Sequence, residues 1–392
     1  MEPVILSAIR TPIGKVRGSL STIRPDDLLA MAFKEATQRA AIPDTAIDEC
    51  FAGCANQAGE DNRNVARMSV LLAGFSEQIP ATTVNRLCAS GLEAVVQAGR
   101  AIRTGDAQVC LAGGVESMTR APYVMAKPDK SFPGGTPQIF DSSLGWRFPN
   151  PKLAERFPLE TMGETAENIA QKYGISRQAQ DQFALESHQK AVLASQNGHF
   201  DAELLKLDEL TQDECPRPDT TLEQLAKLKP AFKKDGSVTA GNSSGLNDGA
   251  AALIVASSAY AQQNGLKPMA TILGSAAYGI DPRFMGLGPV PATQKLLTKL
   301  GLSIDDIDLV ELNEAFAVQA LAVMQELKIL PAKLNISGGA LALGHPLGCS
   351  GARILTTLVH NLHRTGKKLG LATLCVGVGQ GLSMIVRSDM LP

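Results

Sequence analysis

Apolar residues along this chain alternate between short continuous runs and segments with helical spacing. Val4 to Ile9 is a nearly continuous apolar run, and Asp26 to Ala41 repeats its apolar residues at intervals of three and four. These two patterns are typical of a buried strand and of an amphipathic helix. We therefore predict a strand over 4–9 and a helix over 26–41.

The segment from residue 81 to residue 112 has the same order of patterns. Ala81 to Asn85 is a predicted strand, Leu92 to Ile102 has apolar residues at helical spacing, and Gln108 to Ala112 is a second predicted strand. A strand, a helix and a strand in this order predict a parallel sheet with crossover helices. The expected fold class is therefore α/β.

The C-terminal part of the chain repeats this organisation. The segment 301–308 resembles 41–48, and Ser350-Gly351 matches Ser90-Gly91; in both cases the two positions differ by 260. A constant offset in two separate windows favours an internal duplication. Chance identity is the alternative, because few residues match outright, and the shared order of elements decides for the duplication.

The stretch from Met118 to about Lys234 differs from both halves. It contains many prolines and glycines, the single tryptophan, and predicted helices over 166–173 and 177–197. Four lysines lie between Leu225 and Lys234, where a solvated surface is the simplest interpretation. We expect an inserted loop domain that lies over the functional site.

Composition excludes several classes of function. The 392 residues are 44% hydrophobic and 19% charged with a net charge of −2, so no charge excess favours nucleic acid or an anionic membrane as partner. The N-terminus lacks the pattern of a signal peptide, and no apolar run approaches the ~18 residues that cross a bilayer. The C-terminus carries no targeting tripeptide. We expect a cytoplasmic protein.

The cysteine and histidine pattern does not predict a metal site or disulfides. Seven scattered cysteines are an odd number, which favours reduced thiols. Cys50 and Cys54 have no second pair nearby and are interpreted as buried apolar residues. His360 and His363 end a predicted helix and are expected at its surface.

Cys88 stands where a predicted strand gives way to a predicted helix. The free backbone N–H groups and the helix dipole favour a thiolate there, so we expect a lowered pKa for Cys88. The small residues Ala89-Ser90-Gly91 would let a substrate approach closely. One cysteine at a helix start is more often structural, so the position alone defines only a candidate nucleophile.

Three further segments contain candidate chemistry. His345 lies in the glycine-rich loop 338–348, directly before a proline, and is suited to accept a proton from a thiol. Cys375 precedes the alternating glycines of 377–381, whose N–H groups could bind an anion or simply form a turn between strands. The polar segment 311–316 follows a predicted apolar strand, where α/β sheets bind ligands.

Together these segments resemble the four signature blocks of the thiolase family, in the family's order. The blocks are Asn85–Gly91, Asn313–Phe316, Gly344–Pro346 and Cys375–Gly381, and the likeness runs from Arg10 almost to the C-terminus. It implies a duplicated thiolase fold, with two βαβαβαββ halves layered α-β-α-β-α and an inserted loop domain. The expected parts are 1–118 with 245–268 for the N-terminal half, 119–244 for the loop domain, and 269–392 for the C-terminal half.

The resemblance also implies roles for individual residues. Cys88 would carry the acyl group as a thioester, and Cys375 would move the proton on the acetyl carbon. His345 would activate Cys88 and stabilise the oxyanion at the substrate thioester, with Asn313 assisting through a water molecule. The N–H groups of Cys88 and Gly377 would form a second oxyanion hole.

Coenzyme A and acyl-CoA are the substrates that the resemblance implies, with no permanently bound cofactor. Arg217 would lie near the adenine and phosphate end of coenzyme A. The pantetheine and acyl portions would contact the residues Met162, Ala240, Ser244, Ala315 and Phe316.

Three stretches and one further residue bear on which acyl group is used. Gly53–Met68 and Leu144–Phe148 resemble β-ketoadipyl-CoA thiolases, whereas the loop 344–351 resembles fatty-acid 3-ketoacyl-CoA thiolases. Thr161 stands where biosynthetic acetoacetyl-CoA thiolases carry histidine, which argues against a strictly acetoacetyl-CoA-forming enzyme. We expect a 3-ketoacyl-CoA thiolase of fatty acid β-oxidation, with acetoacetyl-CoA and β-ketoadipyl-CoA thiolases as alternatives.

Other classes of function and the assembly were also weighed. A ketoacyl-ACP synthase shares the fold but has no counterpart of Cys375, and a non-catalytic sterol-carrier-like homologue is disfavoured because Cys88 and His345 are both present. The resemblance implies a homodimer or a dimer of dimers, with the strand 81–84 at a two-fold axis. Burial of that strand within one subunit is the alternative.

Overall fold

The computed structural model describes residues 1–132 and 134–389. A ten-stranded sheet has the order β10-β11-β12-β9-β1-β8-β5-β3-β4, with β2 paired to β8, and β6 and β7 form a separate hairpin. The strands are β1 (Pro3–Arg10), β2 (Gly14–Lys15), β3 (Glu49–Gly53), β4 (Ala81–Val84), β5 (Val109–Ser117), β6 (Tyr123–Met125), β7 (Ile139–Asp141), β8 (Asn247–Ser257), β9 (Ala270–Gly279), β10 (Leu309–Leu312), β11 (Leu369–Val376) and β12 (Gln380–Ser388).

The helices alternate with these strands in the way the sequence predicts for an α/β protein. They are α1 (Pro25–Arg39), α2 (Val65–Leu72), α3 (Ser90–Thr104), α4 (Pro151–Arg156), α5 (Met162–Tyr173), α6 (Arg177–Gln196), α7 (Leu222–Ala226), α8 (Ser258–Gln263), α9 (Pro289–Leu300), α10 (Ala317–Leu327), α11 (Ala340–Leu343) and α12 (Leu347–Thr365). Among the described residues, none of these helices combines the length and the apolarity that a membrane crossing requires.

The sheet consists of two similar halves joined by a short antiparallel pairing of β1 with β9. The first half has the order β1-α1-β3-α2-β4-α3-β5-β8, and the second has β9-α9-β10-α10-α11-α12-β11-β12. In the second half the counterpart of β4 is reduced to a single bridge between Val310 and Leu334. The duplicated α/β fold expected from the sequence is therefore confirmed, with one strand shortened.

The duplication extends to single hydrogen bonds. The Asp48 carboxylate accepts the N–H groups of Gln108 and Val109 at 2.7 and 3.0 Å. Exactly 260 positions later, the Asp308 carboxylate accepts the N–H groups of residues 368 and 369 at 3.0 and 2.9 Å. Such coincidence of side chain, partner and offset identifies the two halves as copies of one unit.

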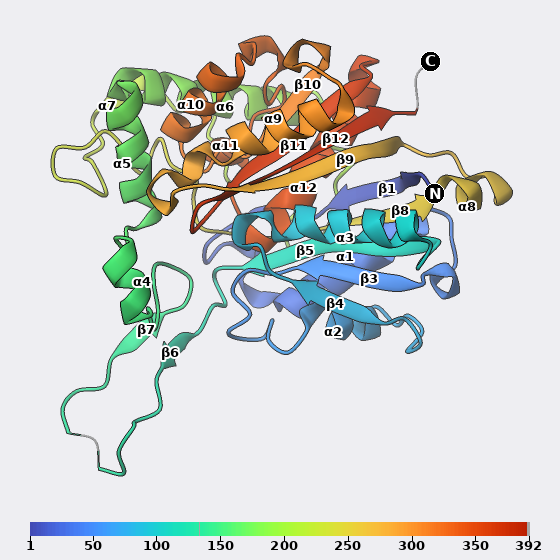
Figure 1. Cartoon of the computed structure of the whole chain (residues 1–392), viewed down its shortest axis with the longest axis horizontal. Helices are drawn as coiled ribbons and strands as arrows, with labels where there is room; N and C mark the ends of the chain where they lie inside the picture. The colour runs from blue at the N-terminus through green and yellow to red at the C-terminus, as the bar shows by residue number, and fades with distance from the viewer. Residues whose placement is uncertain (133, 390–392) are drawn as a thin grey trace.

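Five layers arise because α3 and α12 lie between the two halves (Figure 1). Both helices contact strands of both halves, and the central apolar core gathers around them. On the outer faces, α1 and α2 cover the first half, while α9 and α10 cover the second.

Glycines allow the N-terminal ends of α3 and α12 to meet backbone to backbone. A Cβ atom at Gly91 would lie 2.7 Å from the carbonyl oxygen of Gly348, which is closer than real contacts allow, and one at Gly351 would collide with Leu92. The matching pairs 90–91 and 350–351 therefore mark the crossing point of the two helices.

The strand predicted over 108–112 was too short for a related reason. β5 continues through Gly113 and Gly114, which the sequence suggested as its end but which serve close contacts with Ala251 and Gly348.

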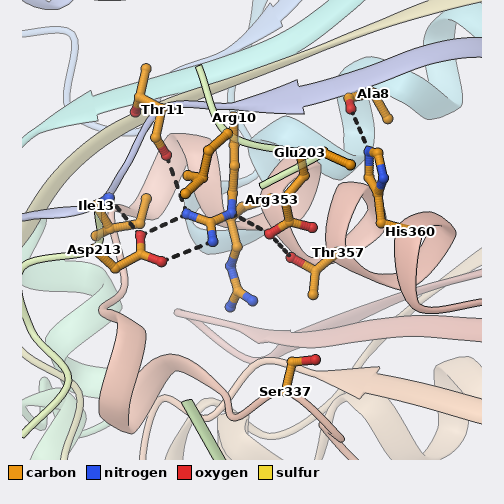
Figure 2. A network of polar contacts seen from close by, with 12 residues as sticks. Ala8, Arg10, Thr11, Ile13, Glu203, Asp213, Ser337, Arg353, Thr357 and His360 are labelled. Atoms are coloured by element: carbon orange, nitrogen blue, oxygen red, sulfur yellow. Dashed lines mark hydrogen bonds and ion pairs between the residues drawn. The ribbon is translucent and has the colours of Figure 1, made fainter. Parts of the chain in front are cut away.

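The region between β5 and β8 contains the predicted helices as α5 and α6, which pack against α10. Its hairpin β6–β7 lies away from the body of the molecule (Figure 1). A buried ion-pair network holds the end of the region, because Arg10 of β1 donates to Asp213 at 2.6 and 2.9 Å and to Glu203 at 2.6 Å (Figure 2). Glu203 also accepts a hydrogen bond from Thr357 of α12 at 3.1 Å. Paired in this way, the buried charges tie the segment 203–213 to both halves.

Candidate active site

Cys88 lies in a short 3-10 helix, η3 (Leu87–Ala89), between β4 and α3. The residue before it, Leu87, has a left-handed backbone with φ of 47°. Its N–H donates to the Asn85 side chain at 2.9 Å, and its carbonyl accepts the Ser90 hydroxyl at 2.7 Å. A branched residue in this conformation is strained, and the surrounding hydrogen bonds hold it there. The backbone directly before Cys88 is therefore held in one conformation.

His345 lies between α11 and α12 and is buried. The loop predicted around it is less irregular than expected, because residues 340–343 form the buried helix α11. Nδ1 of His345 lies 2.6 Å from the Ser350 hydroxyl, and the backbone N–H of His345 donates to the Asn247 side chain at 2.9 Å. The Asn313 amide nitrogen is 3.3 Å from Nε2 and 3.4 Å from Nδ1. A position so nearly equidistant from both ring nitrogens places the amide against the ring rather than in line with one lone pair.

Burial keeps the imidazole of His345 neutral. Desolvation, with a smaller contribution from the nearby Arg353 cation, lowers the pKa of His345 to about 3. The ring is therefore unprotonated at neutral pH and available as a proton acceptor. Ser350 occupies Nδ1, which leaves Nε2 as the nitrogen free to act.

Cys375 reaches the same place from the hairpin β11–β12. It is buried at the end of β11, which contacts the short helix η3 that carries Cys88. Burial raises the pKa of Cys375, and a thiolate at Cys88 would raise it further. The N–H of Gly377, in the turn that follows, interacts with the Cys88 sulfur, as does the N–H of Cys88 itself. The turn is thus both the connection between two strands and part of the site. Contacts of η3 with β11 and α12 bring all these segments together.

The expectation of a lowered Cys88 pKa was wrong. Burial among apolar side chains raises the pKa of Cys88 to about 11, although the N–H groups of Gly377 and Cys88 oppose the rise. Only the direction of the helix was visible in the sequence, whereas the desolvating side chains, such as Val84 and Leu87, come from the folded core. Cys88 is therefore a thiol in the free protein and needs a base.

Several of the residues proposed for coenzyme A gather beside this site. Ala315 and Phe316 belong to the same apolar cluster as Cys375, and the N–H of Ser244 donates to the Ala315 carbonyl at 3.0 Å. The sulfur of Met162 lies 3.6 Å from the position that a Cβ atom at Gly377 would take. Together they form one wall.

Arg217 and Ala240 are exposed and lie outside that wall. The backbone N–H of Arg217 donates to His188 of α6 at 3.2 Å.

Two residues that contact His345 were not recognised as such in the sequence. Ser350 was noted only as a helix start, and Asn247 was not noted, because both act through contacts that depend on the fold. His360 and His363, expected at the surface, are partly buried and hydrogen-bond backbone carbonyls of Ala8 and Met269 at 2.9 and 2.7 Å. In each histidine the Nε2 atom is therefore occupied by a backbone carbonyl.

Two family models match the chain. The model described as thiolase, N-terminal domain, covers residues 3–259, and the model described as thiolase, C-terminal domain, covers residues 266–388.

Individual relatives match over nearly the whole length. The chain is 53% identical to a β-ketoadipyl-CoA thiolase of Pseudomonas aeruginosa and 46% identical to an acetyl-CoA acetyltransferase of Escherichia coli, with 98% of each chain covered in both cases. Among solved structures, human mitochondrial 3-ketoacyl-CoA thiolase in complex with CoA matches with a TM-score of 0.94 and 41% identity, over 99% of this chain and 98% of the human one.

Proposed function

We propose that this chain, which belongs to the thiolase family and is therefore an acyltransferase acting on coenzyme A thioesters, cleaves 3-oxoacyl-CoA substrates whose acyl chain ends in a carboxylate, such as 3-oxoadipyl-CoA. The reaction with coenzyme A would give acetyl-CoA and an acyl-CoA shortened by two carbons. Cys88, His345, Cys375, Asn313 and Gly377 would form the catalytic machinery.

In the first half-reaction, Cys88 attacks the 3-oxo carbon and His345 Nε2 accepts the thiol proton. Burial raises the pKa of Cys88 and lowers that of His345, so a resting thiolate–imidazolium pair is disfavoured and proton transfer accompanies the attack. The bond between the second and third acyl carbons breaks. Cys375, kept protonated by burial, donates its proton to the departing acetyl-CoA carbanion.

In the second half-reaction, the coenzyme A thiol attacks the acyl-Cys88 thioester. Its proton passes to the deprotonated Cys375, and the departing Cys88 sulfur takes back the proton that His345 accepted in the first half-reaction, so that the enzyme returns to its initial state. The N–H groups of Gly377 and Cys88 would stabilise the oxyanion formed at the acyl-enzyme, where one such donor typically contributes about 3–4 kcal/mol.

The observation that supports the acyl preference is a contact between two segments. Gly53–Met68 and Leu144–Phe148, both of which resemble β-ketoadipyl-CoA thiolases, touch each other: the Arg147 guanidinium donates to the Asn56 carbonyl at 3.2 Å. The neighbouring Ala55 carbonyl accepts the Asn85 side chain at 2.9 Å, next to the nucleophile. The two segments therefore form one wall near Cys88. A relative with 53% identity that is named for β-ketoadipyl-CoA agrees with this assignment.

The test is a matched pair of substrates. 3-Oxoadipyl-CoA and 3-oxohexanoyl-CoA have the same number of acyl carbons, and only the first ends in a carboxylate. We expect kcat/KM for 3-oxoadipyl-CoA to be at least about tenfold higher, with acetoacetyl-CoA cleaved as well. A preference for 3-oxohexanoyl-CoA and longer unbranched chains would instead support the role in fatty acid β-oxidation that the loop 344–351 suggests.

A homodimer or a dimer of dimers is part of this proposal. β4 is one of the two edge strands of the sheet and is incompletely buried in one subunit, which leaves its free edge for a second copy. The hairpin β6–β7 and its surroundings also expose large apolar residues, namely Tyr123, Met125, Phe132, Ile139 and Leu144. Light scattering should give a mass of at least twice 41.3 kDa. A fully active monomer would contradict the assembly.

A further inference from the structure

Glu116, in β5, has no role in the steps above, yet its carboxylate is at the centre of a buried cluster of hydrogen bonds. Its side chain is 1% exposed. Oε2 accepts the N–H groups of Gly348 at 2.8 Å and Ala55 at 3.0 Å, and Oε1 accepts the N–H of Asn56 at 3.2 Å. These three partners are backbone donors, and the Cys54 thiol is a fourth, weaker donor to Oε1 at 3.9 Å. No cation pairs with the carboxylate among the described residues.

The hydrogen bond from Gly348 connects Glu116 to the part of the chain that contacts the proposed base, His345. Gly348 is the second residue of α12, whose N-cap residue Pro346 provides no side-chain cap. Glu116 supplies the missing acceptor from another element, and a negative charge at a helix N-terminus is favourable. The same turn of α12 carries Ser350, whose hydroxyl lies 2.6 Å from Nδ1 of His345. Glu116 thereby holds the turn that orients the imidazole.

The other bonds lead to the nucleophile. The carbonyl of Ala55 accepts the Asn85 side chain at 2.9 Å, and the Asn85 oxygen accepts the N–H of Leu87 at 2.9 Å. Leu87 is the strained residue directly before Cys88. A single carboxylate is thus connected through short paths to the two segments that must meet for proton transfer.

We propose that Glu116 is a positioning residue, whose ionised carboxylate fixes the loop of Cys88 against the first turn of α12 so that the thiol and His345 stay aligned during acyl transfer.

Burial disfavours the ionised form of Glu116, so an ionised carboxylate at this position suggests a role in function. Burial raises the pKa of Glu116 to about 7, and the Asp61 carboxylate adds to the rise. The other titratable groups that face it are the thiols of Cys54, whose sulfur is 3.9 Å from Oε1, and of Cys88 and Cys349. None of them supplies a compensating positive charge.

Only the ionised form can serve all three donors equally. A protonated carboxyl, or the amide of a glutamine, would turn a hydrogen toward one of the N–H groups. The link should therefore loosen as pH falls through the pKa of Glu116. A cation is not required by the cluster: the ligand atoms of Cys54, Asp61 and Glu116 lie within 4.8 Å of one another, but the backbone N–H groups directed at Glu116 oppose a positive ion.

The test compares Glu116→Gln with Asp61→Asn, which removes a carboxylate of the same cluster that is not bonded to Gly348. Thiolysis of acetoacetyl-CoA is the readout, because it depends only on membership of the thiolase family and not on the proposed acyl preference. At about pH 8 we expect Glu116→Gln to lower kcat at least about tenfold with KM for coenzyme A within about threefold. Asp61→Asn should keep kcat within about threefold.

The pH profile separates positioning from a general loss of structure. In the wild type, kcat should fall below a pKa near 7, and this step should be missing in Glu116→Gln. Because the folded-state pKa is raised above the unfolded value, ionised Glu116 costs stability as pH rises, so Tm of Glu116→Gln minus Tm of the wild type should increase from about pH 5.5 to about pH 8. Three results would each overturn the proposal: kcat near that of the wild type, an unchanged pH profile, or, if the variant does not fold, a wild-type profile without the step near pH 7.

Discussion

The two halves of the molecule share a backbone plan but contribute different chemistry from equivalent places. Residue 85 in the first half corresponds to residue 345 in the second. Asn85 uses its side chain locally, bonding the Ala55 carbonyl and the Leu87 N–H at 2.9 Å each. His345 instead directs its ring to Ser350 and Asn313. The duplicated frame brings two loops together at one point, and the side chains that differ between them give one loop the proposed nucleophile, Cys88, and the other the proposed base, His345.

A second difference lies one strand away. Asn313, which contacts His345, corresponds to Gly53 of the first half, where a Cβ atom would collide with the backbone of Ser90. The first half therefore has no room for a side chain at a position where the second half places a polar one. The residues proposed for the site therefore come from both halves, with Cys88 in the first and Asn313 and His345 in the second.

The strongest test of the comparison is removal of the nucleophile. In Cys88→Ser the hydroxyl has a far higher pKa than the thiol, so thiolysis should fall by about 10⁴-fold or more while the fold is retained. Acetoacetyl-CoA cleavage, followed by loss of the enolate absorbance, measures the effect, and the thermal unfolding curve is the control. If the variant turned over at close to the wild-type rate, Cys88 would not be the nucleophile and the proposed contribution of the first half would be wrong.

Replacing the base by the residue of the equivalent position makes the second half resemble the first. His345→Asn should lower kcat by about 10³-fold, since an amide does not accept the thiol proton at neutral pH. Since His345 is not among the residues proposed to contact coenzyme A, binding of coenzyme A to the variant, measured by calorimetry, should change little. A small loss of kcat would mean that another group acts as base.

The resting state of the nucleophile can be measured without any substitution. Because burial raises the pKa of Cys88 to about 11, the thiolate fraction should grow about tenfold per pH unit between about pH 8 and about pH 10. The rate of alkylation by iodoacetamide, located at Cys88 by peptide mass spectrometry, should rise in the same proportion. If the rate of alkylation reached a plateau below pH 8, Cys88 would be a thiolate at neutral pH, as expected from the sequence.

The smallest expected effect is on stability, and it tests whether equivalent residues of the two halves contribute equally. Asp48 and Asp308 each accept two backbone N–H groups at equivalent sites. Asp48→Ala and Asp308→Ala should each cost about 1–2 kcal/mol of unfolding free energy, because both carboxylates are partly solvated, and leave kcat unchanged. Denaturant unfolding gives the values. Very unequal losses would show that the copies have diverged in stability as well as in chemistry.

Much of this arrangement was predictable from the sequence, for identifiable reasons. Strands and helices follow from apolar spacing, and glycine and proline mark the loops of His345 and Cys375, where the backbone has to turn closely. The pKa of Cys88 and the contacts of Ser350, Asn247 and Glu116 were not predictable. Each of these depends on groups that the fold brings from distant positions, such as Gly348 to Glu116, and no local pattern records them.

The central claim is that acyl transfer passes through Cys88 in a site shared by both halves. The most direct measurement is peptide mass spectrometry of the enzyme mixed with acetoacetyl-CoA in the absence of free coenzyme A and quenched in acid. The account predicts an acetyl group on the peptide that contains Cys88 and its loss when coenzyme A is added before the quench. An acetyl group on the peptide of Cys375, or no acyl-enzyme at all, would contradict it.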